Sequence, residues 1–388
     1  MKQDRQSDSL TRGVAGLTAG VAAIGAEALV MSPVLEDISA SLGASPGTIG
    51  VAVAAYGFAL TVASPLFALF GHKLDRLTLM LSGLALFVLA TAGCGLAQGP
   101  ASLVGARVAC GIAAGAYLPA CYAFVGDAIP YERRARVMGR IMFGWSLSLV
   151  IGVPLGGLVG QLLGWRFAFF AVALVGLAAF LMIAGFRKGT QQSSATGSVG
   201  GAVRWPLPRP VWAVFGITFF NMLGFYGVYT YLGTAVRNAQ HVGSAGAAAY
   251  VLCYGLGLAC STLRGDLLDR LGKVRLLAVA LLLLCPLLAS QAIAVSHPAL
   301  LAPAMFVWGV LQGVVLTGIS TVLTQQAGAT KGMATALNSS LTYLAVAMGA
   351  TLGGIALERG PGFAGICFVA AGASLLSWML LRASRISA

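Results

Sequence analysis

Long apolar stretches alternate with short polar segments along the whole chain of 388 residues. A helix needs about 20 predominantly apolar residues to cross the hydrocarbon core of a bilayer, and runs of that length recur from end to end. We predict twelve such spans, at residues 13–35, 48–70, 77–97, 101–126, 137–163, 167–186, 211–234, 245–264, 274–296, 299–325, 332–357 and 361–381. The pattern therefore predicts an all-α membrane protein.

A longer polar segment divides this series of spans into two equal sets. Residues 187–210 are rich in Gly and Ser and end in prolines, which is typical of a flexible linker. We predict an N-terminal six-helix bundle over 1–186, a cytoplasmic linker over 187–210 and a C-terminal six-helix bundle over 211–388. Short patterns repeat between the halves at offsets of 194 and 197 residues. Transporters built from two related halves bind substrate between them near the middle of the membrane.

The basic residues predict the orientation of the spans. Of the 24 Lys and Arg residues, 20 fall on the side that holds both termini, three fall on the opposite side, and Arg107 lies inside a span. Cytoplasmic loops carry the excess of Lys and Arg, so both termini are expected in the cytoplasm.

Composition excludes several other classes of protein. Hydrophobic residues make up 58% of the chain, charged residues 9%, and the mean hydropathy is +0.89, which leaves too little polar surface for a soluble protein. The net charge of +13 is spread over short clusters between spans, which argues against a nucleic-acid partner. Seven cysteines lie in or beside apolar spans without a C-x-x-C pattern, and the three histidines are scattered in loops. We therefore expect no metal site, cofactor or enzymatic centre.

Two loops carry related motifs of Gly, Asp and basic residues. The loop after the eighth span has the pattern G-x-x-x-D-R-x-G-K. The loop after the second span has the first glycine, the aspartate and the arginine of this pattern, but Thr78 and Leu79 stand in place of the second glycine and the basic residue. This pattern resembles a signature of the major facilitator superfamily. The resemblance implies a fold of two pseudo-symmetric six-helix bundles and a gating role for Gly71, Asp75, Arg76, Gly265, Asp269, Arg270, Gly272 and Lys273. A plainer alternative is that each Asp-Arg pair only solvates a tight turn.

Further motifs resemble those of the drug:proton antiporters in that superfamily. Arg107 with Gly111 resembles their span 4 motif, and the glycines and proline of the fifth span resemble their antiporter motif: Gly152, Pro154, Gly156 and Gly157. The resemblance extends to bacterial multidrug, sugar-efflux and chloramphenicol-resistance-like branches. It implies an antiporter in the bacterial inner (cytoplasmic) membrane, which exports small amphipathic compounds in exchange for protons. We expect the chain to act as a monomer. A sugar or metabolite transporter on the same scaffold is the alternative. Generic helix packing would explain the glycines equally well.

Two embedded charges are the candidates for proton coupling. Glu27 alone among the eleven acidic residues lies well inside a span, nine residues or about 14 Å before Glu36 at the outer side. Arg107 lies nine residues after Gln98 and therefore at a similar depth. We hypothesise that Glu27 carries the proton and that Arg107 modulates its affinity, because desolvation favours a neutral carboxyl whereas a nearby arginine favours the carboxylate. A static ion pair between spans 1 and 4 is the alternative.

Aromatic residues with a few polar neighbours are the candidates for substrate binding. A lining of aromatic faces and polar tips suits amphipathic small molecules. The candidates are Tyr56, Tyr117, Asn221, Phe225, Tyr226, Tyr229, Trp308 and Gln312. Each of them taken singly is also explained by packing in a helical core.

Overall fold

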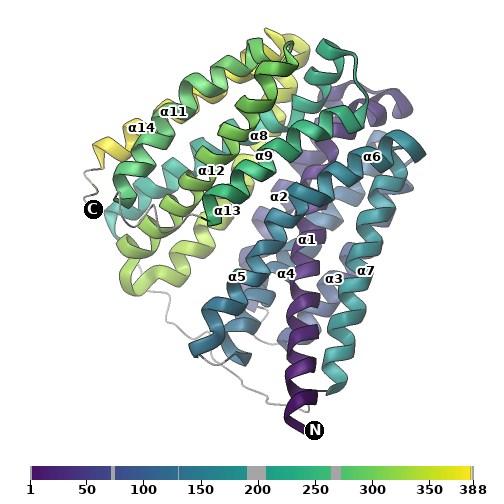
Figure 1. Ribbon diagram of the computed structural model, residues 1–388, viewed down its shortest axis with the longest axis vertical. Coiled ribbons are helices and arrows are strands. Elements are labelled where there is room, and N and C mark those ends of the chain that lie inside the picture. The colour runs from purple at the N-terminus through teal and green to yellow at the C-terminus, as the bar shows by residue number, and fades with distance from the viewer. Residues whose placement is uncertain are drawn as a thin grey trace.

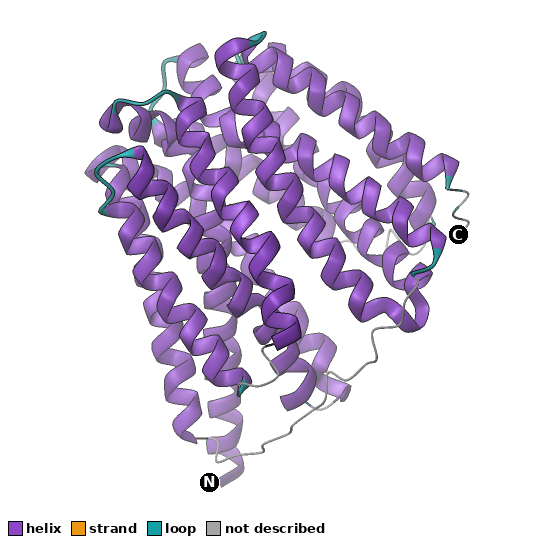
Figure 2. Ribbon diagram, turned by 180° about the vertical axis from the view of Figure 1, so that it is seen from behind, coloured by secondary structure: helices purple, strands orange, loops and turns teal. Residues whose placement is uncertain are grey.

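The computed structural model describes residues 2–70, 75–129, 131–189, 207–263, 272–384 and 386. Twelve helices in this part of the chain are long and apolar enough to cross a membrane, which confirms the predicted spans. No strand occurs among the described residues (Figure 2). The helices are α1 (Lys2–Leu42), α2 (Pro46–Phe70), α3 (Arg76–Gly95), α4 (Pro100–Ala128), α5 (Tyr131–Leu147), α6 (Val153–Leu163), α7 (Trp165–Gly189), α8 (Arg209–Gln240), α9 (Ser244–Leu263), α11 (Lys273–Ala294), α12 (Pro298–Ala327), α13 (Lys331–Arg359) and α14 (Gly362–Ala383).

The fifth crossing combines two α-helices and a π-helical turn. The turn, Ser148–Gly152, joins α5 to α6 just before Pro154. A proline cannot donate a backbone hydrogen bond, so the regular ladder must be broken near it. The structure accommodates that break with the wider i→i+5 turn, which is often found at functional positions.

Two helices extend further than the sequence predicts. The expected ends were residues 35 and 234, whereas α1 continues to Leu42 and α8 to Gln240. The added turns lie side by side, and Asp37 of α1 forms an ion pair with Arg237 of α8 at 2.5 Å. The extra turns thus bring two opposite charges of the two helices together.

The helices form two groups that meet at one end of the molecule (Figure 1). Helices α1 to α7 make up one group and α8 to α14 the other, and we call these the first and second halves. The far end is the end at which loops 43–45, 164 and 241–243 join the helices. The halves approach each other there and diverge toward the end where the N-terminus lies.

Glycines at equivalent positions in the two halves pack against residues that are also at equivalent positions. Gly152 packs against Ala26 in the first half, and Gly349 packs against Leu223 in the second. Both residues of the second pair are 197 positions after those of the first. The repeated motif seen in the sequence thus corresponds to a repeated helix contact, of the π-helical turn before α6 on α1 and of α13 on α8.

A second repeated contact joins the halves to each other. Gly157 of α6 packs against Ser244 at the start of α9, and Gly354 of α13 packs against Gly47 at the start of α2. The offset is again 197 residues. A Cβ on Gly157 would lie 2.9 Å from the Ser244 carbonyl oxygen, and one on Gly354 would lie 3.2 Å from the Cα atom of Gly47. The missing side chains therefore permit the close approach of the halves at the far end.

Hydrogen bonds reinforce the contact between α1 and α8. The Ser32 hydroxyl donates to the Tyr229 carbonyl oxygen at 2.5 Å, and the Tyr229 hydroxyl donates to the Leu29 carbonyl oxygen at 3.3 Å. Nearer the far end, Ser45, which directly precedes α2, donates to the carboxylate of Glu358 in α13. These contacts hold the far end of the molecule closed.

Candidate functional site

A buried ion pair lies at the centre of the first half. Glu27 is the fifteenth of the 30 residues in the span Gly13–Leu42, and Arg107 lies about 11 Å from the start of α4. Arg107 Nη1 donates to the Glu27 carboxylate and, at 3.1 Å, to the Glu27 backbone carbonyl. Arg107 Nε donates to the Ala52 carbonyl of α2 at 3.3 Å. Neither side chain has any exposed surface, so the two opposite charges compensate each other where water is excluded.

Tyr56 of the first half contacts this pair, and two tyrosines of the second half lie near it. The Arg107 guanidinium carbon lies 4.4 Å from the centre of the Tyr56 ring, within the range of a cation–π contact. Tyr226 of α8 lies within electrostatic reach of Arg107, and Tyr343 of α13 within reach of Tyr56. Tyr226 and Tyr343 are half-buried. The charges of the first half are therefore close to the second half without being exposed to it.

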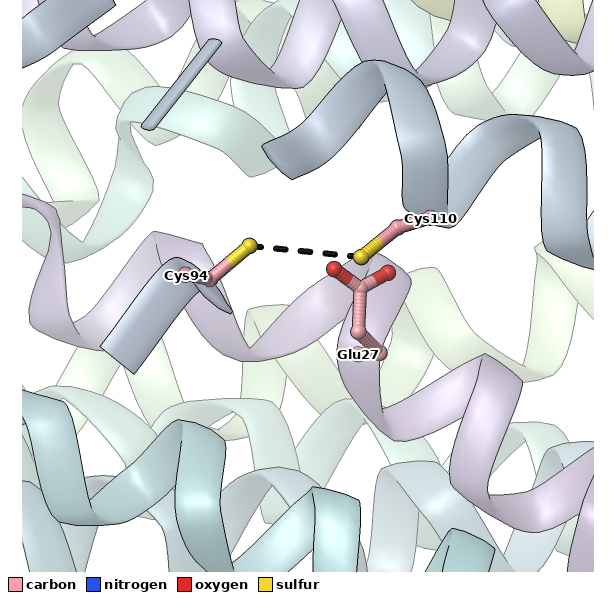
Figure 3. A group of neighbouring side chains, drawn as sticks. All are labelled: Glu27, Cys94 and Cys110. Atoms are coloured by element: carbon pink, nitrogen blue, oxygen red, sulfur yellow. Dashed lines mark hydrogen bonds between the residues drawn. The ribbon is translucent and has the colours of Figure 1, made fainter. Parts of the chain in front are cut away.

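Two thiols lie near the carboxylate of Glu27 (Figure 3). Cys94 of α3 and Cys110 of α4 are fully buried, with their sulfur atoms 3.9 Å apart. The Thr91 hydroxyl lies 3.7 Å from the Cys110 sulfur. No pattern in the sequence indicates the group of Glu27, Cys94 and Cys110, because these residues come from three different helices.

The second half holds a packed aromatic cluster, which we define as Phe225, Tyr229, Tyr254 and Trp308. Phe225 stacks on Tyr229 with ring centres 5.4 Å apart, and its ring centre lies 5.3 Å from that of Trp308. The Trp308 and Tyr254 ring centres are 5.4 Å apart in an edge-on contact. All four side chains are buried, so in this conformation the cluster fills its own interior.

Other predicted substrate residues lie in three different places. Asn221 and Gln312 lie in the second half and are joined by a 2.8 Å hydrogen bond, both being buried. Tyr226 packs edge-on against Phe225 at 4.9 Å between ring centres. Tyr117 lies apart from all of these, because its hydroxyl donates to the Leu17 carbonyl inside the first half.

Sequence reasoning missed several aromatic residues near the boundary between the halves. Tyr343 lies within electrostatic reach of both Tyr226 and Tyr122 of α4. Trp145 Nε1 donates to the Tyr122 hydroxyl at 3.4 Å, and these two side chains are half-buried. Tyr254 was also missed, although it follows Tyr56 by 198 residues and an offset close to 197 would have identified it.

The loop motifs are described only in part. Asp75 directly precedes α3, and its carboxylate accepts hydrogen bonds from the Thr78 backbone N–H at 3.0 Å and from the Thr78 hydroxyl at 2.9 Å. This is a local helix cap. Arg76 is the first residue of α3 and Lys273 the first of α11. Gly272 precedes α11 with a φ of +85°, which favours glycine. The remaining motif residues lie outside the described part of the chain: Gly71, Gly265, Asp269 and Arg270.

The predicted antiporter motif lies between α1 and the second half. Gly156 packs against Val30 of α1, and the Ser244 hydroxyl of α9 donates to the Gly157 carbonyl at 3.0 Å. Pro154, half-buried, follows the π-helical turn. The motif thus provides a smooth surface on which two helices from different halves converge.

Comparison with known proteins relates the chain to membrane transporters. The family model of the Major Facilitator Superfamily matches residues 16–350. The MFS-type transporter YwfA of Bacillus subtilis is 35% identical over 370 residues, covering 94% of this chain and 90% of that protein. A chloramphenicol resistance protein of Streptomyces lividans is 30% identical over 322 residues, covering 81% of each chain.

Solved structures share the fold. The human organic anion transporter MFSD10 (TETRAN) superimposes with a TM-score of 0.68 at 19% identity, over 96% of this chain and 99% of that one. A bacterial homologue of the human lysosomal transporter Spinster, in an inward-facing and occupied conformation, gives 0.68 at 18% identity, over 96% and 94% of the two chains. At such identities the likeness concerns the fold alone.

Proposed function

The chain belongs to the Major Facilitator Superfamily and is a membrane transporter, and we propose that it is a proton-coupled antiporter that exports small amphipathic compounds by alternating access. Proteins of this superfamily are carriers and not enzymes. The observation that supports proton coupling is the Glu27–Arg107 pair, which is fully buried at mid-helix. Embedding charges costs about 2.5–3.5 kcal/mol per residue on insertion scales, so embedded ionisable groups usually serve a function.

In the proposed mechanism Glu27 carries the proton and Arg107 sets its affinity. While Arg107 donates to the carboxylate, the ionised form of Glu27 is favoured; when the two separate, desolvation favours the protonated form. A rocking movement that changes their separation therefore changes proton occupancy. Each proton entering down about 100 mV releases about 2.3 kcal/mol, which drives export of the substrate.

The closed far end fits one conformation of such a cycle. The excess of Lys and Arg on the side of the termini supports a cytoplasmic location for that side. With the far end closed by contacts such as Asp37–Arg237, the protein then has an inward-facing form, as the Spinster homologue has. Because Glu27 has no exposed surface here, proton exchange with water belongs to another conformation.

The half-buried aromatic residues between the halves are the proposed substrate contacts. Tyr122, Tyr226 and Tyr343 combine ring faces with hydroxyl groups, which suits amphipathic molecules. The chloramphenicol resistance protein among the relatives supports a drug-like substrate. In this proposal the buried cluster around Trp308 packs against these three tyrosines and holds their side chains in place for the substrate.

The remaining expectations complete the proposal. We propose that residues 1–186 and 211–388 move as two bundles joined by a cytoplasmic linker at 187–210. The chain would act as a monomer in the bacterial cytoplasmic membrane, and the relatives in Bacillus and Streptomyces support a bacterial setting.

A reconstituted transport assay tests the proposal. The purified chain is placed in liposomes with an imposed pH gradient, and lumenal pH is followed while amphipathic compounds are added. We expect substrate-dependent proton movement in the unaltered protein and its loss in Glu27→Gln, which keeps the shape and the hydrogen-bond acceptor for Arg107. Glu36→Gln, in the same helix near the far end, is the matched control and should transport normally. Unchanged coupling in Glu27→Gln would mean that the ion pair is only structural.

A sugar or metabolite transporter is the alternative function. The buried amide pair of Asn221 and Gln312 favours it, since amides can exchange their mutual hydrogen bond for bonds to sugar hydroxyls. The same liposomes, challenged with neutral sugars and with amphipathic drugs in separate runs, distinguish the two classes by which compounds move protons.

A further inference from the structure

Glu27, Cys94 and Cys110 bring three metal-binding atoms together in the interior of the first half (Figure 3). One carboxylate oxygen and the two sulfur atoms lie within 4.8 Å of one another, and all three residues are buried. Thiolates select soft cations such as Zn²⁺, Cd²⁺ and Cu⁺. We propose that this group binds one soft divalent cation, with Zn²⁺ as the natural candidate and Cd²⁺ as its probe.

The spacing of the sulfur atoms matches such an ion. Zinc binds thiolate sulfur at about 2.3 Å in tetrahedral geometry, which places two sulfur ligands about 3.8 Å apart. The sulfur atoms of Cys94 and Cys110 are 3.9 Å apart. They therefore need little movement to become ligands, because α3 and α4 already hold them at the required separation.

A free oxygen of Glu27 supplies the third ligand. Arg107 donates to Oε1 of the carboxylate, whereas Oε2 is buried without a hydrogen-bond partner among the described residues. An unsatisfied buried carboxylate oxygen is costly, and a cation beside it would remove that cost. With two sulfurs and one oxygen from the protein, the fourth tetrahedral position is left for water or for the Thr91 hydroxyl, which lies 3.7 Å from the Cys110 sulfur.

The charges balance when the ion enters. In the empty site the charges of the Glu27 carboxylate and the Arg107 guanidinium cancel. Binding of a divalent cation displaces the two thiol protons, so two positive charges enter and two leave. The buried region stays neutral with Arg107 in place, which avoids the large cost of a net charge in a dry interior.

Titration of the full-length, reconstituted chain with Cd²⁺ alone tests the proposal. We expect one Cd²⁺ per chain, detected by thiolate-to-metal charge-transfer absorption, and a rise in melting temperature because the ion joins α1, α3 and α4. Cys94→Ser and Cys110→Ser should each weaken binding by more than the roughly 10–100-fold that loss of an outer partner costs. Cys121→Ser is the matched control, a fully buried thiol further along α4, and Cys260→Ser removes an exposed thiol.

Several outcomes would overturn the site. One is that the unaltered chain at saturating Cd²⁺ shows neither the charge-transfer absorption nor a rise in melting temperature. Another is that Cys94→Ser binds Cd²⁺ as tightly as the unaltered chain does. The third is that the absorption is lost in Cys260→Ser and kept in the Cys94 and Cys110 variants. Because the melting shift is measured on the unaltered chain, poor folding of a variant does not obscure the answer. Neither a proton gradient nor a transport substrate is present, so this result is independent of the proposed antiport.

Discussion

Equivalent positions in the two halves hold opposite kinds of chemistry. Gly111 packs against the Tyr56 carbonyl, and Gly309 packs against the Tyr254 carbonyl 198 residues later. By the same offset, Met305 occupies the place of Arg107 in the second half.

The acidic partner follows the same pattern. Ala26 and Leu223 make equivalent glycine contacts at an offset of 197, so Gly224 occupies the place of Glu27. In the first half an ion pair thus lies beside Tyr56, whereas in the second half aromatic rings surround the equivalent residue, Tyr254. This difference teaches that one scaffold can assign charge coupling to one half and apolar packing to the other, as the proposed antiport requires.

Removing one charge should produce the largest effect and should act unequally on the two partners. Glu27→Leu leaves a guanidinium that cannot lose its proton, and we expect a loss of about 3–5 kcal/mol in the free energy of unfolding. Arg107→Met should cost less, because the remaining carboxyl can take up a proton and become neutral. Thermal unfolding in detergent, repeated at several pH values, measures both. Equal losses in the two variants would contradict the comparison.

Truncation of the aromatic cluster should be costly but independent of pH. Trp308→Ala removes a fully buried ring, and we expect a loss of about 3 kcal/mol, the lower limit for such truncations, since lipid provides little hydrophobic driving force. Substrate affinity should fall while the number of protons moved per substrate stays constant. Trp212→Ala, at a residue that is 52% exposed, is the control. A changed proton ratio in Trp308→Ala would show that coupling is shared between the halves.

The sequence predicted what depends on period and depth. The length of the apolar runs predicted twelve spans, and the equal depth of Glu27 and Arg107 in spans 1 and 4 predicted that the two could pair. What it could not predict is the direction of a side chain around a helix that is apolar on every face. Tyr117 of α4 therefore joined the substrate candidates, although its hydroxyl bonds to Leu17 within the first half. The contact between Cys94 and Cys110 could not be predicted for the same reason.

The loop motifs show a further limit. Thr78 replaces the glycine that Gly272 supplies in the second half, and the consequence is structural: α3 already includes Thr78, whereas α11 begins only after Gly272. The different residues at these positions show that the two loops are not alike. They do not predict the helix cap that Asp75 forms with Thr78, because that cap depends on backbone geometry.

Filling the repeated glycine contacts should affect both halves alike. A side chain at Gly157 would collide with Ala248 of the opposite half, whereas one at Gly354 would collide with the Tyr231 hydroxyl of its own half and crowd Gly47 of the opposite half. Overpacking of this kind costs about 1–3 kcal/mol. We expect Gly157→Val and Gly354→Val each to weaken closure of the far end, seen as faster hydrogen exchange in segments 29–37 and 229–237. Gly105→Val, where a side chain would meet open space, should leave exchange unchanged. An effect of only one variant would mean that the interface is less symmetric than its contacts.

The ion pair between Asp37 and Arg237 should have the smallest effect, and it has no counterpart in the repeat. The equivalent positions, at an offset of 197, are Thr234 and Ala40. Asp37 and Arg237 retain 29% and 16% of their side-chain exposure, so solvent screens them. A double-mutant cycle with Asp37→Asn and Arg237→Gln should give a coupling of about 0.2–1 kcal/mol that declines with added salt. A coupling of zero would mean that the glycine contacts, which occur in both halves, close the far end without help from this ion pair. Glu27 and Arg107 would then be the pair whose charges distinguish the two halves energetically.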